Sequence, residues 1–339
     1  MRHFLIFILC ISLLGTPVYG QANRKGCPKV ALVLGGGGAK GAAEVGVLKC
    51  LQQQNVPIDL VVGTSIGSIV GGLYCAGIDV NTLDKLFRSQ EWIDLFTDRN
   101  SSFKGDIYKE QDGVSYVFGF PIKRNPNANG NVKNTVGVLK GDSITSLFGR
   151  ISGYSEPMNF DDLPTPFRCI AVDVKTMEEV VFGKGSLPHA MRASMAIPGV
   201  FKPLRMGDRM LIDGGALNNL PVDVARSLGA DIVIAVDLSQ DADLKNEPKS
   251  NWLTDTFGGM DLGGHLNWLI RRPDNQKYRK NLKEADLIIT PDLHEYDVAS
   301  FTAKAISVMI DRGEAAAKKV EKQIADLSQK ARLPKSTNE

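Results

Sequence analysis

A serine between a predicted strand and a predicted helix is the first residue in this sequence whose surroundings indicate chemistry. Ser65 lies at the centre of the stretch GTSIGS, in which Gly63, Ser65 and Gly67 form the pattern G-x-S-x-G. Apolar residues before it predict a strand, and apolar residues at three- to four-residue spacing after it predict a helix. Such a sharp turn needs small neighbours, because a Cβ at either flanking position would collide with the strand or the helix. The pattern predicts a nucleophilic serine, and a serine that only caps the helix is the alternative.

A run of glycines follows an earlier apolar segment and opens another predicted helix. In the stretch LGGGGAKG, residues 34–41, backbone N–H groups can turn toward one point at the helix N-terminus, which makes an anion site. Gly36, Gly38 and Gly41 also match G-x-G-x-x-G, the spacing of a dinucleotide site. Against that reading, Asp59 precedes its strand, whereas a ribose-binding acid belongs at the end of a strand. We favour an oxyanion hole, whose N–H groups stabilise charge on an acyl carbonyl.

The base that would activate Ser65 is less obvious, because the chain has only four histidines. The order Ser65, Asp213 and then His265 or His294 would fit an α/β-hydrolase with a Ser-Asp-His arrangement. Both histidines fall in polar segments, which favours ordinary surface positions for them. The residues alone leave a histidine-dependent esterase open.

Asp213 is the acidic residue whose surroundings are most distinctive. It ends a short apolar strand and is followed by Gly214 and Gly215, which relieve crowding beside a carboxylate that approaches another loop. An aspartate in a surface D-G turn is the ordinary alternative. Ser194 lacks a strand-turn-helix context and is expected in a helix that stops before a proline, and Asp173 is expected in a strand-end turn. Neither is predicted to be catalytic.

The elements that must position these residues alternate between strand and helix. Apolar runs at 30–34, 59–62, 168–172, 231–236 and 286–290 predict buried parallel strands. Helical patterns lie between them, which favours a doubly wound α/β sheet. Residues 98–140 and 239–280 are polar and irregular, and the first of these segments is predicted to form a flap with a hairpin at VSYVFGF. Residues 298–327 predict one long amphipathic helix.

The N-terminal residues have the layout of a secretory signal peptide. Arg2 precedes an apolar run over 4–14, and small or neutral residues lead to an expected cleavage site near Gly20. The run is shorter than the roughly 20 apolar residues that span a bilayer. We therefore expect residues 1–20 to direct export, with the mature protein in the periplasm, at the periphery of the outer membrane or secreted.

Composition excludes several classes of protein. The formal net charge is +2 and charged residues make up 23% of the chain, so nothing indicates a nucleic-acid partner. Cys27, Cys50, Cys75 and Cys169 are sparse for a chain of this size, and we expect no disulfide framework. No group of His, Cys and Asp has metal-ligand spacing, so no metal is predicted.

Three motifs together give a resemblance to a known family. In the order GGGAKG, GTSIG and DGG, the sequence resembles the patatin-like phospholipases over roughly residues 29–240. The stretches MRASMAIPGVF and LIDGGALNNLPVDVARSLGADIVIAVDLS are similar to bacterial members of this family. The resemblance implies a three-layer α/β/α patatin-like fold with a mainly parallel central sheet, and residues 241–330 would form a C-terminal extension packed on it, with a long terminal helix.

The resemblance also implies a mechanism. Members of this family use a Ser-Asp dyad, so Asp213 would activate Ser65 directly and an acyl-serine intermediate would form. Backbone N–H groups would hold the oxyanion, namely those around Gly36, Gly37, Gly38 and Lys40. Lys40 stands where the family most often has arginine, and Glu44 stands where many bacterial members have histidine and receives no role.

The sequence thus predicts a lipid acyl hydrolase of the phospholipase A type. Its substrate would be a phospholipid or another lipid ester, reached at a membrane surface to which the protein binds peripherally, and it would need no cofactor. The alternatives are a non-catalytic domain that binds a membrane or partner, and a conventional Ser-His-Asp esterase.

Overall fold

The computed structural model describes most of the chain outside a few segments. The described residues are 26–89, 92, 108–111, 114–117, 120–124, 139–198, 200–239, 275–298 and 300–335. The predicted signal peptide, residues 1–20, lies outside the described residues, as do His265 and much of the two irregular segments.

The centre of the molecule is a parallel sheet. Its parallel strands pair in the order β7-β2-β1-β12-β13. These strands are β1 (Val30–Leu34), β2 (Leu60–Thr64), β7 (Phe167–Asp173), β12 (Ile232–Val236) and β13 (Leu287–Ile289). All five coincide with the predicted apolar runs to within two residues at each end. The predicted mainly parallel α/β fold is confirmed.

Three antiparallel strands complete the sheet around β7, and one of them brings two chain segments end to end. They are β8 (Glu178–Phe182), β10 (Leu204–Met206) and β11 (Arg209–Asp213). Because β8 occupies one edge of β7, β2 and β11 must share its other edge. There Thr64 of β2 lies opposite Ile170, and Asp213 of β11 lies opposite Ala171. The carboxyl ends of β2 and β11 therefore meet at consecutive residues of β7.

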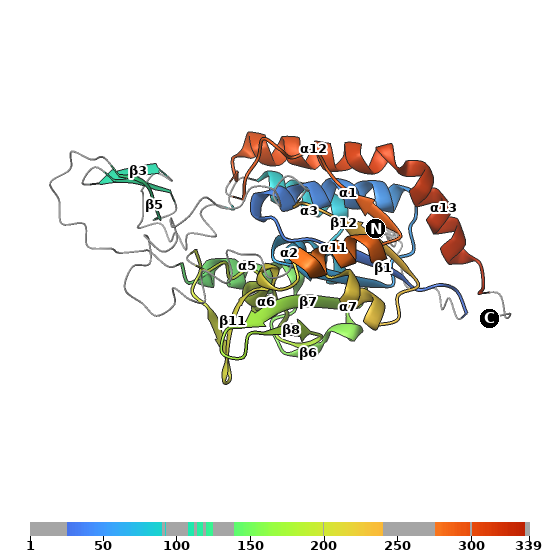
Figure 1. Ribbon diagram of the computed structural model, residues 1–339, viewed down its shortest axis with the longest axis horizontal. Helices are drawn as coiled ribbons and strands as arrows, with labels where there is room; N and C mark the ends of the chain where they lie inside the picture. Colours follow the sequence, from blue (N-terminus) through green and yellow to red (C-terminus); the bar gives the residue numbers. More distant parts are fainter. Residues whose placement is uncertain are drawn as a thin grey trace, which may run out of the picture.

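Helices cover both faces of the sheet and make three layers (Figure 1). Side chains of β1 alternate between the faces: Leu32 and Leu34 pack with α1, α2 and α12, whereas Ala31 and Val33 pack with α7 and α11. The helices are α1 (Ala42–Gln53), α2 (Ile66–Cys75), α3 (Val80–Arg88), α5 (Asp142–Ser152), α6 (Leu187–Ser194), α7 (Val222–Ser227), α11 (Asn275–Glu284), α12 (Ala303–Lys319) and α13 (Glu321–Arg332). Among the described residues, no helix is long and apolar enough to cross a bilayer.

Two glycines let α1 and α12 approach backbone to backbone. A Cβ at Gly46 would lie 1.9 Å from the Ile310 carbonyl oxygen, and one at Gly313 would lie 1.8 Å from the Ala43 oxygen. Such distances are far below van der Waals contact, so both positions require glycine. This packing fixes α1, and with it the short helix η1 (Gly38–Gly41) at the end of the glycine run.

The C-terminal part differs from the sequence prediction. The helix expected over 298–327 begins at Ala303, is divided at Val320 and continues as α13. The division lets α13 run past the end of α1, where Arg332 donates to the Asn55 carbonyl and Gln54 bonds to Glu321. Residues 287–289 of the predicted extension form β13, a strand of the main sheet.

A second, small sheet contains the predicted hairpin. Strands β3 (Tyr108–Gln111), β4 (Val114–Val117) and β5 (Phe120–Arg124) pair antiparallel, and β4 and β5 fall at the stretch VSYVFGF. This sheet is drawn at the left of Figure 1. Its role as a flap stays a prediction.

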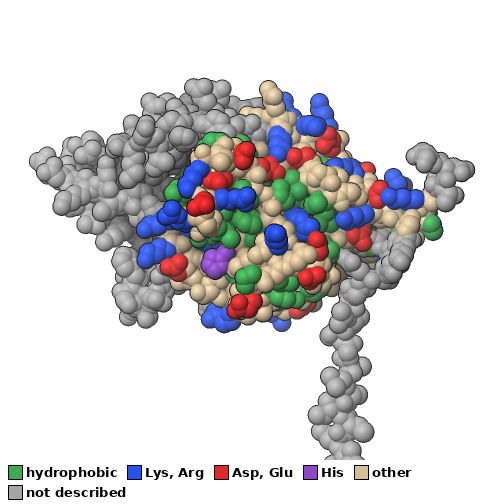
Figure 2. Space-filling model, turned by 90° about the horizontal axis from the view of Figure 1, so that it is seen from below, with side chains coloured by type: hydrophobic (Ala, Val, Ile, Leu, Met, Phe, Trp, Pro, Cys, Tyr) green, Lys and Arg blue, Asp and Glu red, His purple; other side chains and the backbone are tan. Residues whose placement is uncertain are grey.

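On the face in Figure 2, the coloured Lys and Arg side chains are interspersed with Asp and Glu.

Candidate active site

Ser65 occupies the turn between β2 and α2 in a left-handed backbone conformation. Its φ and ψ are 55° and −123°, a region that L-residues rarely adopt and that is typical of a strained nucleophile turn. A Cβ at Gly63 would lie 2.4 Å from the Gly67 carbonyl oxygen, and one at Gly67 would lie 2.4 Å from the Leu34 oxygen. Both flanking positions therefore need glycine, for the steric reason that the sequence pattern indicates.

The structure brings Ser65 and Asp213 together at the junction of β2 and β11. Ser65 Oγ donates to Asp213 Oδ2 at 2.6 Å, and the second carboxylate oxygen accepts the Gly215 N–H at 2.7 Å. Both side chains are nearly enclosed, with exposed fractions of 5% and 7%. A Cβ at Gly214 would lie 2.3 Å from the Ile170 oxygen, so the glycine allows the close approach of the carboxylate segment to β7. The candidate nucleophile and the candidate base are thus in direct contact.

Burial changes the acid strength of Asp213. Desolvation raises its pKa from 3.8 to about 6, although the hydrogen bonds from Ser65 and Gly215 act in the opposite direction. A carboxylate with a pKa nearer neutrality is a stronger base toward a hydroxyl group than an ordinary aspartate is. The environment of Asp213 therefore suits it to accept a proton.

The glycine loop offers two of the four predicted oxyanion donors. The Gly36 N–H donates to the Asn219 carbonyl at 3.0 Å, and the Lys40 N–H donates to the Gly37 carbonyl at 3.3 Å, so both are engaged within the fold. The N–H groups of Gly37 and Gly38 have no acceptor among the described residues. Gly38 has a φ of 57°, which favours glycine. The predicted set of four donors is thereby reduced to these two.

Sequence reasoning missed a third candidate donor, the N–H of Ile66. It is the first residue of α2, and the first N–H groups of a helix have no partner within the helix. In strand-turn-helix hydrolases the residue after the nucleophile supplies this donor. Its place directly after Ser65 in the pattern could have identified it.

Ser194 and Asn219 hold the two loops, and neither role was predicted. Ser194 ends α6 as expected, but its Oγ accepts the Ser65 N–H at 2.9 Å. Asn219 Nδ2 donates to the Gly36 carbonyl at 3.1 Å and to Ser239 Oγ at 2.8 Å. The sequence signals were present as the serine of RASMA and the second asparagine of GALNNL. Only the fold places them beside the site.

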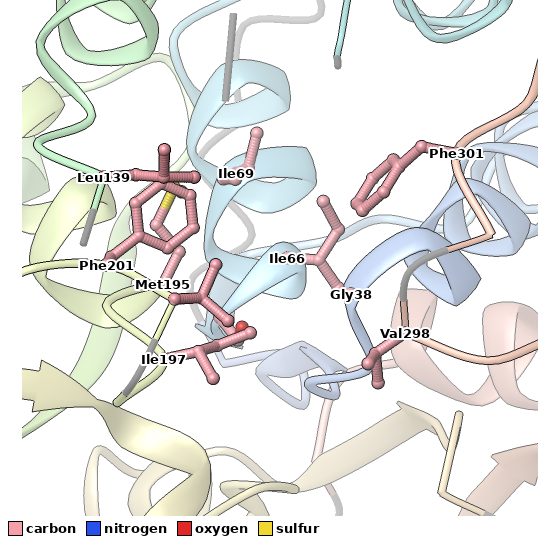
Figure 3. Close-up of a pocket in the computed structure, with 11 residues that line it drawn as sticks. Gly38, Ile66, Ile69, Leu139, Met195, Ile197, Phe201, Val298 and Phe301 are labelled. Atoms are coloured by element: carbon pink, nitrogen blue, oxygen red, sulfur yellow. The ribbon is translucent and has the colours of Figure 1, made fainter. Parts of the chain in front are cut away.

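An apolar pocket opens beside Ser65. It encloses about 600 Å³ of space, part of it open to solvent. Figure 3 shows Ile66 and Ile69 from α2 facing the gap, with Leu139 and Phe201 on one side and Phe301 on the other. None of the residues that line it comes from the described strands of the small sheet.

A buried arginine fixes one wall of this pocket. Arg192 on α6 is almost completely buried, and its guanidinium donates to the carbonyl oxygens of Lys140 and Lys202. It also lies 4.8 Å from the centre of the Phe201 ring. The arginine therefore ties the two segments that carry Leu139 and Phe201 to α6.

The remaining predicted residues lie in other settings. The His294 side chain is largely exposed and lies 3.9 Å from Asp292, while His265 lies outside the described residues. Asp59 accepts the Val30 N–H, and Asp173 accepts the N–H groups of neighbouring turn and strand residues. Lys40 is half-buried in η1. No cluster of metal-ligating side chains occurs in the described part of the chain.

Comparisons with known proteins give one consistent family. A family model described as patatin-like phospholipase matches residues 32–226. Human patatin-like phospholipase domain-containing protein 6 is 34% identical over 270 residues, 78% of this chain and 16% of that protein. An uncharacterized NTE family protein of Mycobacterium bovis is 32% identical over 223 residues, 66% of this chain and 52% of that protein. The chain therefore spans about half of the mycobacterial relative's length and about a sixth of the human one.

Two solved structures are also similar. VipD from Legionella pneumophila has a TM-score of 0.47 and 14% identity, with 87% of this chain and 67% of that chain covered. The type III effector protein ExoU has a TM-score of 0.42 and 14% identity, with 88% and 53% covered.

Proposed function

Because this chain belongs to the patatin-like phospholipase family, we propose that it is a lipid acyl hydrolase of the phospholipase A type that works through a Ser65–Asp213 dyad. The observation that carries the proposal is the 2.6 Å hydrogen bond from Ser65 Oγ to Asp213 Oδ2 beside an apolar pocket. In this proposal Ser65, Asp213 and a site for an acyl chain lie together, and none of the described residues that line the pocket is a histidine.

In the proposed reaction, Asp213 accepts the Ser65 hydroxyl proton while Oγ bonds to the acyl carbonyl carbon. The carbonyl oxygen becomes an oxyanion, held by the N–H groups of Gly37, Gly38 and Ile66. The bond to the alcohol then breaks, and the leaving oxygen takes the proton from Asp213. Water attacks the acyl-Ser65 ester, gives its proton to the same carboxylate, and the fatty acid is released as Ser65 regains its proton.

The pocket and its surroundings support a lipid ester as the substrate. Its lining is almost entirely apolar, which suits an acyl chain, because burying each CH₂ group gives about 0.8 kcal/mol. Lys40 follows the oxyanion donors in η1 and carries a charge that attracts a phosphate head group. Peripheral membrane binding and export directed by residues 1–20 belong to the same proposal and rest on the sequence pattern.

Release of fatty acid tests the proposal directly. The protein should release fatty acid from phospholipid vesicles or hydrolyse a p-nitrophenyl ester, and Ser65→Ala and Asp213→Asn should each reduce kcat by at least about 1,000-fold. Circular dichroism should show that both variants are folded. A Ser65→Ala variant that retains its activity would overturn the assignment.

Two alternatives have separate outcomes. If a conventional esterase is present, His265→Ala or His294→Ala abolishes turnover, whereas the dyad requires neither histidine. If the domain only binds a membrane or partner, wild-type protein is inert on every ester and still sediments with vesicles. The short hydrogen bond between Ser65 and Asp213 favours the dyad over both.

A further inference from the structure

Arg192 is a buried arginine whose hydrogen bonds reach one wall of the apolar pocket. Its exposed fraction is 1%, although arginine is among the residues that are least often fully buried. Nε and Nη2 donate to the Lys140 carbonyl at 3.0 and 2.6 Å, and Nη2 also donates to the Lys202 carbonyl at 3.0 Å. Lys140 comes directly after Leu139 in the sequence. Lys202 comes directly after Phe201, and both of these neighbours line the pocket.

The two segments that Arg192 contacts are also joined to each other. The Leu139 N–H donates to the Val200 carbonyl, and the Lys202 N–H donates to the Leu139 carbonyl, both at 2.9 Å. These bonds make a bridge between Leu139 and Phe201 that lies outside the named strands. The guanidinium lies 4.8 Å from the centre of the Phe201 ring, a distance at which a cation and an aromatic face attract each other. The wall therefore depends on Arg192 for its attachment to α6.

The same helix also holds the candidate nucleophile. Two residues after Arg192, at the end of α6, Ser194 Oγ accepts the Ser65 N–H. α6 also packs against α2, which begins directly after Ser65. The pocket wall and Ser65 are thus both attached to α6, so the contacts of Arg192 help to set the position of the wall relative to Ser65.

From these contacts we propose that Arg192 is a specificity-determining residue: by holding the wall at Leu139 and Phe201, it makes the protein select esters by the length of the acyl chain. This assignment rests on the proposed function, because it concerns the pocket of the same site. Figure 3 shows the wall across the gap from Phe301, so its position sets how closely an acyl chain is enclosed. A long chain loses contact when the wall shifts, whereas an acetyl group adds only a methyl group to the carbonyl and gains little from the wall.

Arg192→Lys tests the assignment with the positive charge retained. A lysine has one nitrogen at the end of a flexible chain, so it cannot hold both carbonyl oxygens as the planar guanidinium does. With p-nitrophenyl acetate, butyrate, hexanoate and octanoate, wild-type kcat/KM should rise by up to about fourfold for each CH₂ group that is buried. In Arg192→Lys the octanoate-to-acetate ratio of kcat/KM should fall at least about 10-fold, which corresponds to the burial of about two CH₂ groups.

Arg226 provides a matched control for this variant. It lies on α7, on the other face of the sheet from α6, and it is not among the residues that line the pocket. Like Arg192, it donates to backbone carbonyl oxygens, those of Ala230, Asp231 and Glu284. Arg226→Lys should therefore lower stability and leave the octanoate-to-acetate ratio as in wild type.

Gly141→Ala displaces the arginine without replacing it, and it decides the matter if Arg192→Lys does not fold. Gly141 precedes α5 with a φ of 72°, and a Cβ there would lie 2.2 Å from Arg192 Nε, so the guanidinium must move away from the Lys140 carbonyl. Gly153 at the other end of α5 has a φ of 76°, and nothing lies within 4 Å of an added Cβ. Gly153→Ala therefore introduces similar backbone strain without the clash and should keep the wild-type ratio. Gly141→Ala should lower the ratio as Arg192→Lys does.

Binding of a fatty acid tests the assignment without turnover. In the Ser65→Ala protein, calorimetric titration with dodecanoic acid should give a Kd at least about 10-fold higher when Arg192→Lys is added. Adding Arg226→Lys should leave the Kd unchanged. The assignment is overturned if the Ser65→Ala protein does not bind dodecanoic acid, if Arg192→Lys behaves as Arg226→Lys does, or if the two glycine variants change the ratio equally. A wild type that hydrolyses none of the esters refutes the proposed function, and the titrations still decide the role of Arg192.

Discussion

At the scale of single residues, the proposed dyad requires one carboxylate to activate a serine. An aspartate in water is a weak base for a hydroxyl group, because the two differ widely in acid strength. Burial brings the pKa of Asp213 to about 6, and the single Gly215 N–H on its second oxygen keeps the carboxylate oriented toward Ser65. In the proposed mechanism, the orientation and desolvation of Asp213 replace the imidazole of a triad.

Ser194 is a residue whose importance lies in what it holds. Its Oγ accepts the N–H of Ser65 in a buried position, and loss of that acceptor leaves a buried donor unsatisfied, at a cost of about 1–3 kcal/mol. Ser194→Ala should therefore reduce kcat about 10-fold through displacement of the nucleophile, with little change in KM. Steady-state kinetics on a p-nitrophenyl ester, together with urea unfolding, measure both effects.

Ser328 supplies the control for that variant. It is also a buried serine, but it lies on α13, where its hydroxyl contacts the backbone after α1. Ser328→Ala should leave kcat unchanged. If Ser194→Ala loses stability and keeps wild-type kcat, Ser194 supports the fold alone.

At the scale of secondary-structure elements, the site depends on a register that no local pattern encodes. The apolar runs predict all five parallel strands, because a strand buried on both faces must be apolar throughout. They do not predict that β2 and β11 share one edge of β7 and end at Ile170 and Ala171. β8 pairs with the other edge of β7, so this arrangement depends on contacts between residues that are far apart in the sequence. The shared edge places Asp213 beside Ser65.

The same limit explains which site residues could be predicted. Ser65 and Asp213 could be singled out because the glycines beside them leave a steric signature in the sequence, and the resemblance to the patatin-like phospholipases paired them as a dyad. Gly36 and Lys40 were assigned as donors although their N–H groups are used inside the fold by Asn219 and Gly37. A hydrogen bond between the backbone groups of two residues far apart in the sequence does not depend on the types of their side chains. Free donors can therefore be separated from engaged ones only in three dimensions.

The contact between α1 and α12 makes a prediction at this scale. Gly313→Ala would place a Cβ 1.8 Å from the Ala43 carbonyl oxygen, so the helices must separate and the free energy of unfolding should fall by about 1–3 kcal/mol. Because α1 follows directly after η1, kcat should fall as well. Urea unfolding and steady-state kinetics check the two effects.

Gly149 in α5 is a matched control for this substitution. A Cβ there would meet only a Pro188 carbon at 3.6 Å, an ordinary contact. Gly149→Ala should raise stability by up to about 1 kcal/mol, because alanine is the better helix former. Equal losses for the two glycine substitutions would contradict the close packing of α1 on α12.

At the scale of the whole molecule, the burial of two carboxyl groups, those of Asp213 and Glu44, lowers the free energy of unfolding. The apolar cores on both faces of the sheet stabilise the chain, whereas the desolvation of Asp213 and Glu44 opposes folding whenever the unfolded chain ionises them. Part of the stability is therefore given up for the site, as is common where function requires an unfavourable environment. Removing the charge at Asp213 should recover that part.

Asp213→Asn should consequently be more stable than wild type at neutral pH, while losing activity. The pKa is raised in the folded state, so the contribution of Asp213 to wild-type stability is greatest below about pH 4, where both states are protonated, and falls as pH rises toward 6. A shift from 3.8 to about 6 corresponds to about 3 kcal/mol above pH 6. Urea unfolding of both proteins between pH 4 and 7 should show a difference in the free energy of unfolding that grows to pH 6 and then levels.

Asp79→Asn is a control for the direction of this effect. Hydrogen bonds from Thr82 lower the pKa of Asp79, an exposed helix N-cap, so removal of its carboxylate should lower stability at neutral pH. A difference between Asp213→Asn and wild type that does not change with pH would mean that the carboxylate is not desolvated, and the account of its basicity given above would fail with it.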